Sequence, residues 1–321
     1  MKQQALIRGI FSHKSAAMNM RKTIYALGLA LLMAACNNDE DFVVPSFLHV
    51  DAIKLVPTTT NPISTEEGFY TSDIVSCFVE AYFPGSNRVE MLGLYELPFT
   101  IPILHSGEVE YFVFSPAIKI SGVSGTQTHY SFYRRDTVSN QTLRSGDTLH
   151  LDTLTTSYKI SLNNVRIFEP FEPTEASILL DSVVWHRHTR DSAYAACSGD
   201  GYASVFVPDT VLAVPFSLRN TINVSDPTSA VYLELDTYSD IQFEVYMESQ
   251  YTTNGSTDIQ RVMMVNPTDH WQHMYINLGR TWEWFNYQSP FKLHFRAINA
   301  DGKGGYVRLD NVKVVYTNQI L

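Results

Sequence analysis

The residues of this chain that are best suited to contact a ligand are aromatic and gather near its end. Trp271, Trp282, Trp284, Phe285 and Tyr287 fall within 17 positions. Flat rings exposed on a loop could stack on the apolar faces of sugars. Trp282 and Trp284 would point the same way in an extended segment. We therefore expect Trp282, Trp284 and Tyr287 to bind a ligand, although packing in a core is the usual fate of Trp.

Other polar groups give weaker signals of chemistry. His186, His188 and Asp191 could hold a divalent metal, but exposed positions at the end of a strand explain them better. The residues around Ser198 do not follow the chain order of a Ser, His and Asp catalytic triad, and the GxSxG motif of a nucleophile elbow is absent. Acidic residues are so numerous that no pair stands out as glycosidase carboxylates. We therefore expect a protein that is not an enzyme.

The elements that must position these residues are predicted to be strands. Apolar and polar residues alternate between turn residues, as a half-buried strand requires. The expected strands are 47–55, 74–82, 108–114, 158–162, 178–185, 202–207, 230–235, 241–247, 271–278, 291–297 and 306–316. Beyond residue 35 no convincing 3.6-residue apolar period appears. The fold class is therefore all-β, with two β-sandwich domains in tandem.

Boundaries between these domains follow from composition. The chain has 321 residues, enough for two domains. Pro170 and Pro173, flanked by acids, favour extended chain, so we expect a linker over 169–175. An N-terminal β-sandwich would occupy 46–168 and a jelly roll 176–321. The polar, threonine-rich stretch 133–156 is expected to be a long surface loop.

The charge of the chain is unevenly distributed. The formal net charge is −10, but residues 1–35 contain five Lys and Arg and no acid. Residues 36–321 therefore carry 18 Lys and Arg against 33 Asp and Glu, a net charge of −15. So acidic a chain is a poor candidate for binding nucleic acid, which demands a basic face.

The basic leader has the pattern of a targeting segment. Arg21 and Lys22 precede an apolar run over 24–33, which is too short for a membrane span but suits a signal peptide. Ala34, Ala35 and Cys36 follow, and this sequence resembles a bacterial lipobox. The resemblance implies a signal peptide over 1–35, whose true start could be Met20, and lipidation of Cys36. Acyl chains such as palmitate would then anchor the protein in a membrane.

The residues after Cys36 suggest where the anchor lies. Asn37, Asn38, Asp39, Glu40 and Asp41 resemble the surface-export signal of Bacteroidota lipoproteins. We expect residues 36–45 to be a flexible tether, because acid-rich polar chain cannot pack. The implied location is the outer membrane, with the protein displayed at the cell surface. Of the other cysteines, Cys77 and Cys197, we favour two free buried thiols over a bridge.

Both halves of the chain resemble known architectures. The first contains 94–104, Gly107, 118–124 and Tyr130, an order that resembles uncharacterised Bacteroidota surface lipoproteins with a PEGA-like sandwich. The second ends in the run 306–316, which is similar to the last strand of galactose-binding-like jelly rolls, the fold of many carbohydrate-binding modules. These resemblances imply architecture more strongly than ligand.

The resemblances also imply two kinds of modification or ligation. In calcium-containing jelly rolls an acid matching Asp310 helps hold a structural ion, and Asp181 is the second acid that could contribute. Calcium needs several oxygen ligands, so a turn-capping role is the alternative, and no other cofactor is expected. Asp-Thr pairs resemble Bacteroidota O-glycosylation acceptors, which nominates Thr137, Thr148 and Thr153, although Asp-Thr is also common in turns.

Two functions remain open at this point. The first is an interaction or accessory subunit of an envelope complex, whose partner is an outer-membrane protein. The alternative is a lipoprotein that binds extracellular glycan through aromatic loop residues of its jelly roll. Sequence favours the first narrowly, because the family it resembles has no assigned chemistry. Exposure of Trp282 and Trp284 would discriminate between the two.

Overall fold

The chain folds into β-strands, as the alternating segments predict. The computed structural model describes residues 44–58, 64–86, 88–172, 185–189, 196–224, 230–250, 257–287 and 290–317. Within these ranges the helical elements are short: two 3₁₀ turns, Ser124–Thr126 and Leu162–Asn164, and helix α2 (Gly279–Trp284). None of the described helices is long and apolar enough to cross a membrane. The all-β prediction is confirmed.

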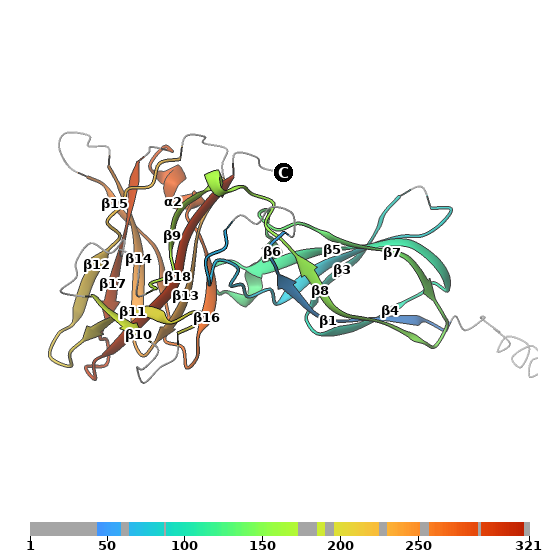
Figure 1. The fold of residues 1–321 in the computed structure, drawn as a ribbon, viewed down its shortest axis with the longest axis horizontal. Coiled ribbons are helices and arrows are strands. Elements are labelled where there is room, and N and C mark those ends of the chain that lie inside the picture. Colours follow the sequence, from blue (N-terminus) through green and yellow to red (C-terminus); the bar gives the residue numbers. More distant parts are fainter. Residues whose placement is uncertain are drawn as a thin grey trace, which may run out of the picture. The chain divides into compact units, whose positions relative to one another are not determined.

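The first half is a sandwich of two sheets (Figure 1). One sheet has the order β4–β1–β8, with β1 antiparallel to β4 and parallel to β8. The other has the order β3–β2–β5–β6, and β7 also pairs with β5. The strands are β1 (Ser46–Leu55), β2 (Ser76–Tyr82), β3 (Glu90–Glu96), β4 (Phe99–Ile103), β5 (Gly107–Lys119), β6 (Gln127–His129), β7 (Asp136–Leu143) and β8 (Thr148–Thr156).

The alternation of side chains explains how this sandwich is filled. In β1, Leu48 and Val50 are buried, whereas Asp51 is exposed. The buried side chains join one core cluster with Val79 of β2 and Phe112 of β5. Burying such a side chain contributes about 1.5–3 kcal/mol relative to exposing it, and this is what fixes the register of each strand.

The prediction of a long surface loop over 133–156 is wrong, because most of this segment forms strands β7 and β8. A turn joins the two strands, in which the Asp147 amide donates to the Arg144 carbonyl over 3.0 Å. Threonine is β-branched and favours strands. Leu149 and Leu151 alternate with polar residues and pack against the core of the first sandwich. The polar composition hid this two-residue period.

The second half is also built from two sheets. The larger has the order β10–β11–β18–β13–β16, with β9 paired to β18, and the smaller has the order β12–β17–β14–β15. Figure 1 shows the four strands of the smaller sheet together. The strands are β9 (Val165–Glu169), β10 (Trp185–Thr189), β11 (Gly201–Val207), β12 (Ala213–Ser217), β13 (Ala230–Ser239), β14 (Gln242–Ser249), β15 (Ile259–Val265), β16 (Gln272–Asn277), β17 (Phe291–Ile298) and β18 (Gly305–Thr317).

The expected boundary near residue 169 needs correction. Strand β9 lies before it, yet pairs antiparallel with β18 and so belongs to the second half. Glu169 and Phe171 are buried, and Phe171 joins the core of the second sandwich. A linker over 169–175 is therefore wrong for residues 169–171, and residues 173–175 lie outside the described ranges. An apolar side chain between the prolines carries this segment into the core instead of leaving it extended in solvent.

Two of the predicted strands do not correspond to strands that the structure describes. The segment 158–162 forms no strand: Tyr158 makes an isolated bridge with Tyr133, and the 3₁₀ turn Leu162–Asn164 follows. The predicted strand over 178–185 lies almost wholly outside the described residues. The other predicted strands coincide with β1, β2, β5, β11, β13, β14, β16, β17 and β18 to within a few residues.

A third core cluster is shared by the two halves. Tyr130 and Tyr158 come from the first half, and Tyr232, Tyr275 and Val315 come from the second. Residues 46–321 form one compact unit. The sandwiches are thus joined by buried aromatic packing as well as by covalent connection.

Candidate functional site

The outer face of the smaller second-half sheet carries an organised set of polar and aromatic side chains. In β14, Phe243, Val245 and Met247 belong to the core. Side chains alternate along a strand, so Glu244 and Tyr246 point to the opposite face. The same alternation in β17 brings outward-facing polar residues beside them.

Strand register places the members of this set side by side. Glu244 of β14 lies opposite Arg296 of β17, and Tyr246 lies opposite His294. On the other side of β14, a register shift between Val245 and Tyr246 brings Arg261 of β15 opposite Tyr246. A bulge of this kind re-aims side chains on the bulged strand. Residues far apart in the chain therefore meet on one face.

Glu244 is the centre of this network. Its side chain is only 2% exposed. Its carboxylate accepts hydrogen bonds from the Tyr246 hydroxyl (2.7 Å), from Arg261 Nη1 (2.7 Å) and from Arg296 Nε (2.8 Å). Burial alone would raise the pKa of the Glu244 carboxyl, but these hydrogen bonds outweigh it and hold the pKa below its ordinary value. Glu244 is therefore an anion that fixes three neighbouring side chains.

A second carboxylate fixes the imidazole of this face. His294 Nε2 lies 2.6 Å from Glu248 Oε2. Burial would raise the pKa of Glu248, but hydrogen bonds from Thr257 and His294 lower it overall. The two glutamates thus act as anchors for neighbouring side chains, and both are ionised at neutral pH.

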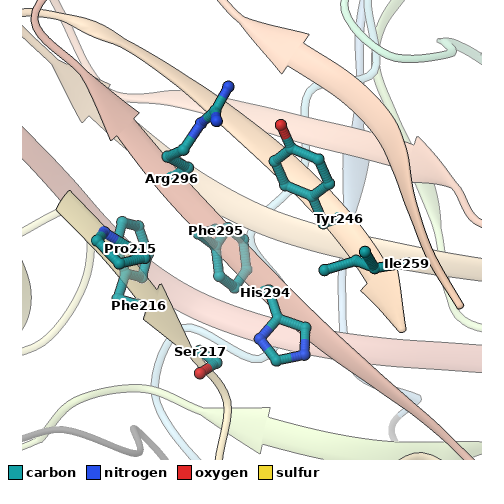
Figure 2. A pocket seen from close by; sticks show the side chains of 8 residues that line it. All are labelled: Pro215, Phe216, Ser217, Tyr246, Ile259, His294, Phe295 and Arg296. Carbon is teal, nitrogen blue, oxygen red and sulfur yellow. The ribbon is translucent and has the colours of Figure 1, made fainter. Parts of the chain in front are cut away.

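A hollow opens on this face beside the network. Its volume is about 430 Å³. Figure 2 shows Tyr246, His294 and Arg296 around it, with Pro215 and Ile259 on opposite sides. Its lining residues are Pro215, Phe216, Ser217, Tyr246, Ile259, His294, Phe295 and Arg296. Apolar walls with a few positioned polar groups are the usual make-up of a site for small organic ligands.

The aromatic residues expected to bind ligand lie elsewhere and differ from one another. Trp282 is 1% exposed and belongs to the core, so its predicted exposure is wrong. The segment forms helix α2 instead of an extended loop, so Trp282 and Trp284 point differently. Trp284 is 68% exposed and Tyr287 is 40% exposed. The Tyr287 ring lies at 90° to Trp282, with 5.3 Å between centroids.

Asp310 is buried within the second half. Its Oδ2 accepts the Cys197 and Ser198 amides at 3.1 and 3.3 Å, and its Oδ1 accepts the Asn311 amide at 2.8 Å. Burial, together with the nearby charge of Asp236, raises the pKa of the Asp310 carboxyl to about 8. Asp181 lies outside the described residues. Among the residues described, no group of three His, Cys, Asp or Glu could hold a metal ion, and calcium at Asp310 stays a prediction.

The remaining predicted sites are placed as follows. Cys36 lies outside the described residues. Thr137 in β7 and Thr148 and Thr153 in β8 are exposed, so each hydroxyl is accessible on a strand, and their glycosylation stays a prediction. His186 and His188 are on β10, and His188 Nε2 lies 2.6 Å from the Ser204 hydroxyl. Cys77 and Cys197 are free thiols.

Sequence reasoning missed Tyr246, Arg296 and their partners. A usable signal was present, because the strands expected over 241–247 and 291–297 each alternate core residues with charged or aromatic ones. That pattern marks a sheet whose outer face is functional or solvated, and it does not tell which. The meeting of Glu244 with Arg296 depends on strand register, which the sequence pattern leaves open.

Comparisons with known proteins bear on the architecture. No protein-family model matches the chain, and no curated protein matches it in sequence. Similar solved structures include a family 30 carbohydrate-binding module (22% identity, 43% of this chain and 77% of that one, TM-score 0.34). Another is the CBM22-1 xylan-binding domain of Paenibacillus barcinonensis Xyn10C (15% identity, 48% and 96%, TM-score 0.32). A third is the K2 adhesin domain of Lys-gingipain (15% identity, 46% and 97%, TM-score 0.32). At TM-scores this low, the likenesses assign no ligand to this chain.

Proposed function

We propose that this protein binds carbohydrate, without transforming it, on the outer face of the sheet β12–β17–β14–β15. The observation that carries the proposal is the hollow in which the Tyr246 ring stands beside Arg296 and His294. Sugars present both apolar C–H faces and hydroxyl groups. A site for them needs flat apolar surface and fixed hydrogen-bonding groups, and this hollow offers both.

The rigidity of the polar groups supports this proposal. Arg296 is held on Glu244 and His294 on Glu248, so little side-chain entropy is lost when a ligand binds. Tyr246 is fixed by its own hydroxyl, which donates to Glu244. A network formed before the ligand arrives is typical of a binding face.

Charge states favour binding over hydrolysis. A glycoside hydrolase needs one carboxyl group with a raised pKa to act as general acid. Here the pKa values of Glu244 and Glu248 are both lowered, so neither carboxyl holds a proton at neutral pH. The described face is therefore suited to hold a sugar and unsuited to protonate a glycosidic oxygen through these glutamates.

The test is retention of the protein by polysaccharides in affinity gel electrophoresis. A panel of plant, host and bacterial glycans is embedded in the gels, and the wild-type protein is expected to be retarded by at least one. Tyr246→Ala should weaken that binding by about tenfold or more, since it removes the ring against which a sugar would pack. Tyr306→Ala is the matched control, because it removes a partly exposed tyrosine from the other sheet. No retardation across the panel would overturn the proposal.

Membrane attachment is a separate part of the proposal. We propose that Cys36 is acylated and holds residues 46–321 at the outer membrane, displayed at the cell surface. Strand β1 begins at Ser46, ten residues after Cys36, which leaves a spacer between the lipid and the sandwiches. Labelling cells with palmitate should mark the wild-type protein and leave Cys36→Ser unmarked. Labelled Cys36→Ser protein would contradict this assignment.

An accessory role in an envelope complex stays a prediction beside glycan binding. A pull-down from native outer membrane with proteomic readout tests it. An outer-membrane protein recovered equally with wild type and Tyr246→Ala, from a protein that no glycan retards, would favour the accessory role. Glycan retardation that depends on Tyr246 would favour the role proposed here.

A further inference from the structure

The charges of the proposed sugar-binding face differ in sign from those of the whole chain. Strands β12, β14, β15 and β17 carry three permanent cations, Arg261, Lys292 and Arg296, and two carboxylates, Glu244 and Glu248. All five lie at positions that alternate with core residues, so they share the outer face. The chain as a whole has a net charge of −10. The face is thus a local positive region on an acidic protein.

The two carboxylates are already engaged, which leaves the cations as the groups open to a ligand. Glu244 is shared between Arg261 and Arg296, so one carboxylate neutralises only one of two guanidiniums. Glu248 is paired with His294. The Arg261 and Arg296 side chains are 54% and 48% exposed, whereas that of Glu244 is almost wholly covered. A ligand therefore meets more guanidinium than carboxylate surface, since the Glu248 side chain is only 20% exposed.

Arg296 is the cation that lines the hollow. Its Nε and Nη2 are directed to Glu244, and Nη1 makes no hydrogen bond to any residue described. A guanidinium donates most strongly to planar anionic oxygens, in charge-assisted bonds. In Figure 2, Arg296 stands next to the Tyr246 ring. The Arg296 guanidinium carbon lies over the Tyr246 ring, 5.6 Å from its centroid, so a sugar packed on the uncovered part of the ring would bring a ring substituent within reach of Arg296.

We infer that the hollow selects anionic glycans, in which a uronate carboxylate or a sulfate is held by Arg296 while the sugar ring packs on Tyr246. This inference rests on the proposed carbohydrate-binding function and names the substrate class of the same site. Neutral glycans would leave the excess positive charge of the face uncompensated. Lys292 and Arg261 add to the field that attracts the anion.

The experiment compares ligands that differ only in charge. Oligogalacturonides and their fully methyl-esterified forms are titrated into the purified protein at 50 mM salt, and dextran sulfate and neutral dextran oligosaccharides form a second pair. The charged member of at least one pair should bind at least about tenfold more tightly than its uncharged counterpart, the gain expected from one charge-assisted hydrogen bond. Binding of that member should weaken as salt is raised to 500 mM, because added ions screen the attraction.

Two arginine variants locate the effect. Arg296→Gln and Arg261→Gln remove the same charge and each takes one partner from Glu244, although Arg296 contacts that carboxylate through two nitrogens and Arg261 through one. Only Arg296 lines the hollow. We expect Arg296→Gln to reduce affinity for the anionic ligand at least about tenfold and Arg261→Gln to reduce it about threefold or less. Arg296→Lys, which keeps the charge but loses the planar fork, should fall between.

The outcomes distinguish failure of the anionic assignment from failure of carbohydrate binding itself. Tight binding of uncharged glycans with no preference for the charged member would overturn the anionic assignment and leave carbohydrate binding standing. If the protein binds neither charged nor uncharged glycans, the anionic assignment and the carbohydrate-binding function are both overturned. Equal losses in Arg296→Gln and Arg261→Gln would show that general charge, and not a contact in the hollow, drives binding.

Discussion

Lys313 Nζ lies 3.2 Å from Glu234 Oε2, and both side chains are completely buried. The two residues stand on neighbouring strands, β18 and β13, of the second half. His273 of β16 lies 3.6 Å from the same Glu234 oxygen. Further partners come from the first half: the Tyr158 hydroxyl donates to Glu234 over 2.7 Å, the Tyr130 hydroxyl donates to the same carboxylate, and Lys313 donates to the Phe69 carbonyl. A buried ion pair of one sandwich is thus completed by the other.

Removing one member of this pair should be costly. Lys313→Met removes the lysine that is paired with the buried Glu234 anion, and we expect a loss of about 3–5 kcal/mol in the free energy of unfolding. Replacing both residues with apolar ones, as in Lys313→Met with Glu234→Leu, should cost less than Lys313→Met alone. Urea unfolding of the wild type, the Lys313→Met and Glu234→Leu single variants and the double variant measures this. A double variant less stable than both single variants would contradict the account.

The same pair should make the protein sensitive to acid. Burial would raise the pKa of Glu234, but Lys313, His273 and Tyr130 lower it to about 2, from an ordinary value of 4.5. The stability contributed by this ionised group is present above pH 4.5 and is lost as pH falls towards 2, since the unfolded chain takes up the proton first. The difference in unfolding free energy between wild type and Glu234→Gln should shrink over that window. A difference that stays constant from pH 5 to pH 2 would be inconsistent with this role.

The two halves should unfold together. All four Trp residues lie at or beyond residue 185, so their fluorescence reports the second half. Cys77 is buried in the first half, and burial raises the pKa of its thiol to about 12, so it should resist thiol reagents while folded. In a Cys36→Ser, Cys197→Ser background, thiol labelling and fluorescence should give the same urea midpoint. Separate midpoints would mean that the shared core does not couple the halves.

Substitution of Trp282 should lower the stability of the protein, whereas substitution of Trp284 should not. Trp282→Ala removes a core side chain and is expected to cost about 3–5 kcal/mol in the free energy of unfolding. Trp284→Ala removes an exposed ring and should change that energy by about 0.5 kcal/mol or less. Thermal unfolding of both variants measures the contrast. A large loss of stability in Trp284→Ala would show that its ring is packed.

The sequence allowed the strands to be predicted much better than the site. Alternation of apolar residues identified β1, β13, β14, β17 and β18, because a half-buried strand leaves a direct two-residue period. Polar composition concealed β7 and β8, where Thr and Asp occupy the outward positions. The burial of Phe171 was not predicted, because the prolines on either side of it indicated an exposed linker. The burial of Trp282 was not predicted either, because a helix of six residues is too short to show a helical period. Glu244 and Arg296 are 52 positions apart, and only strand pairing brings them together.

The most direct test of the central claim is the dissociation constant for the best glycan of the panel, measured by calorimetry with Tyr246→Ala and with Trp284→Ala. If the hollow on the four-stranded sheet is the binding site, Tyr246→Ala raises the constant at least about tenfold and Trp284→Ala leaves it unchanged. The reverse pattern, with binding lost in Trp284→Ala and kept in Tyr246→Ala, would contradict the account and move the site to helix α2.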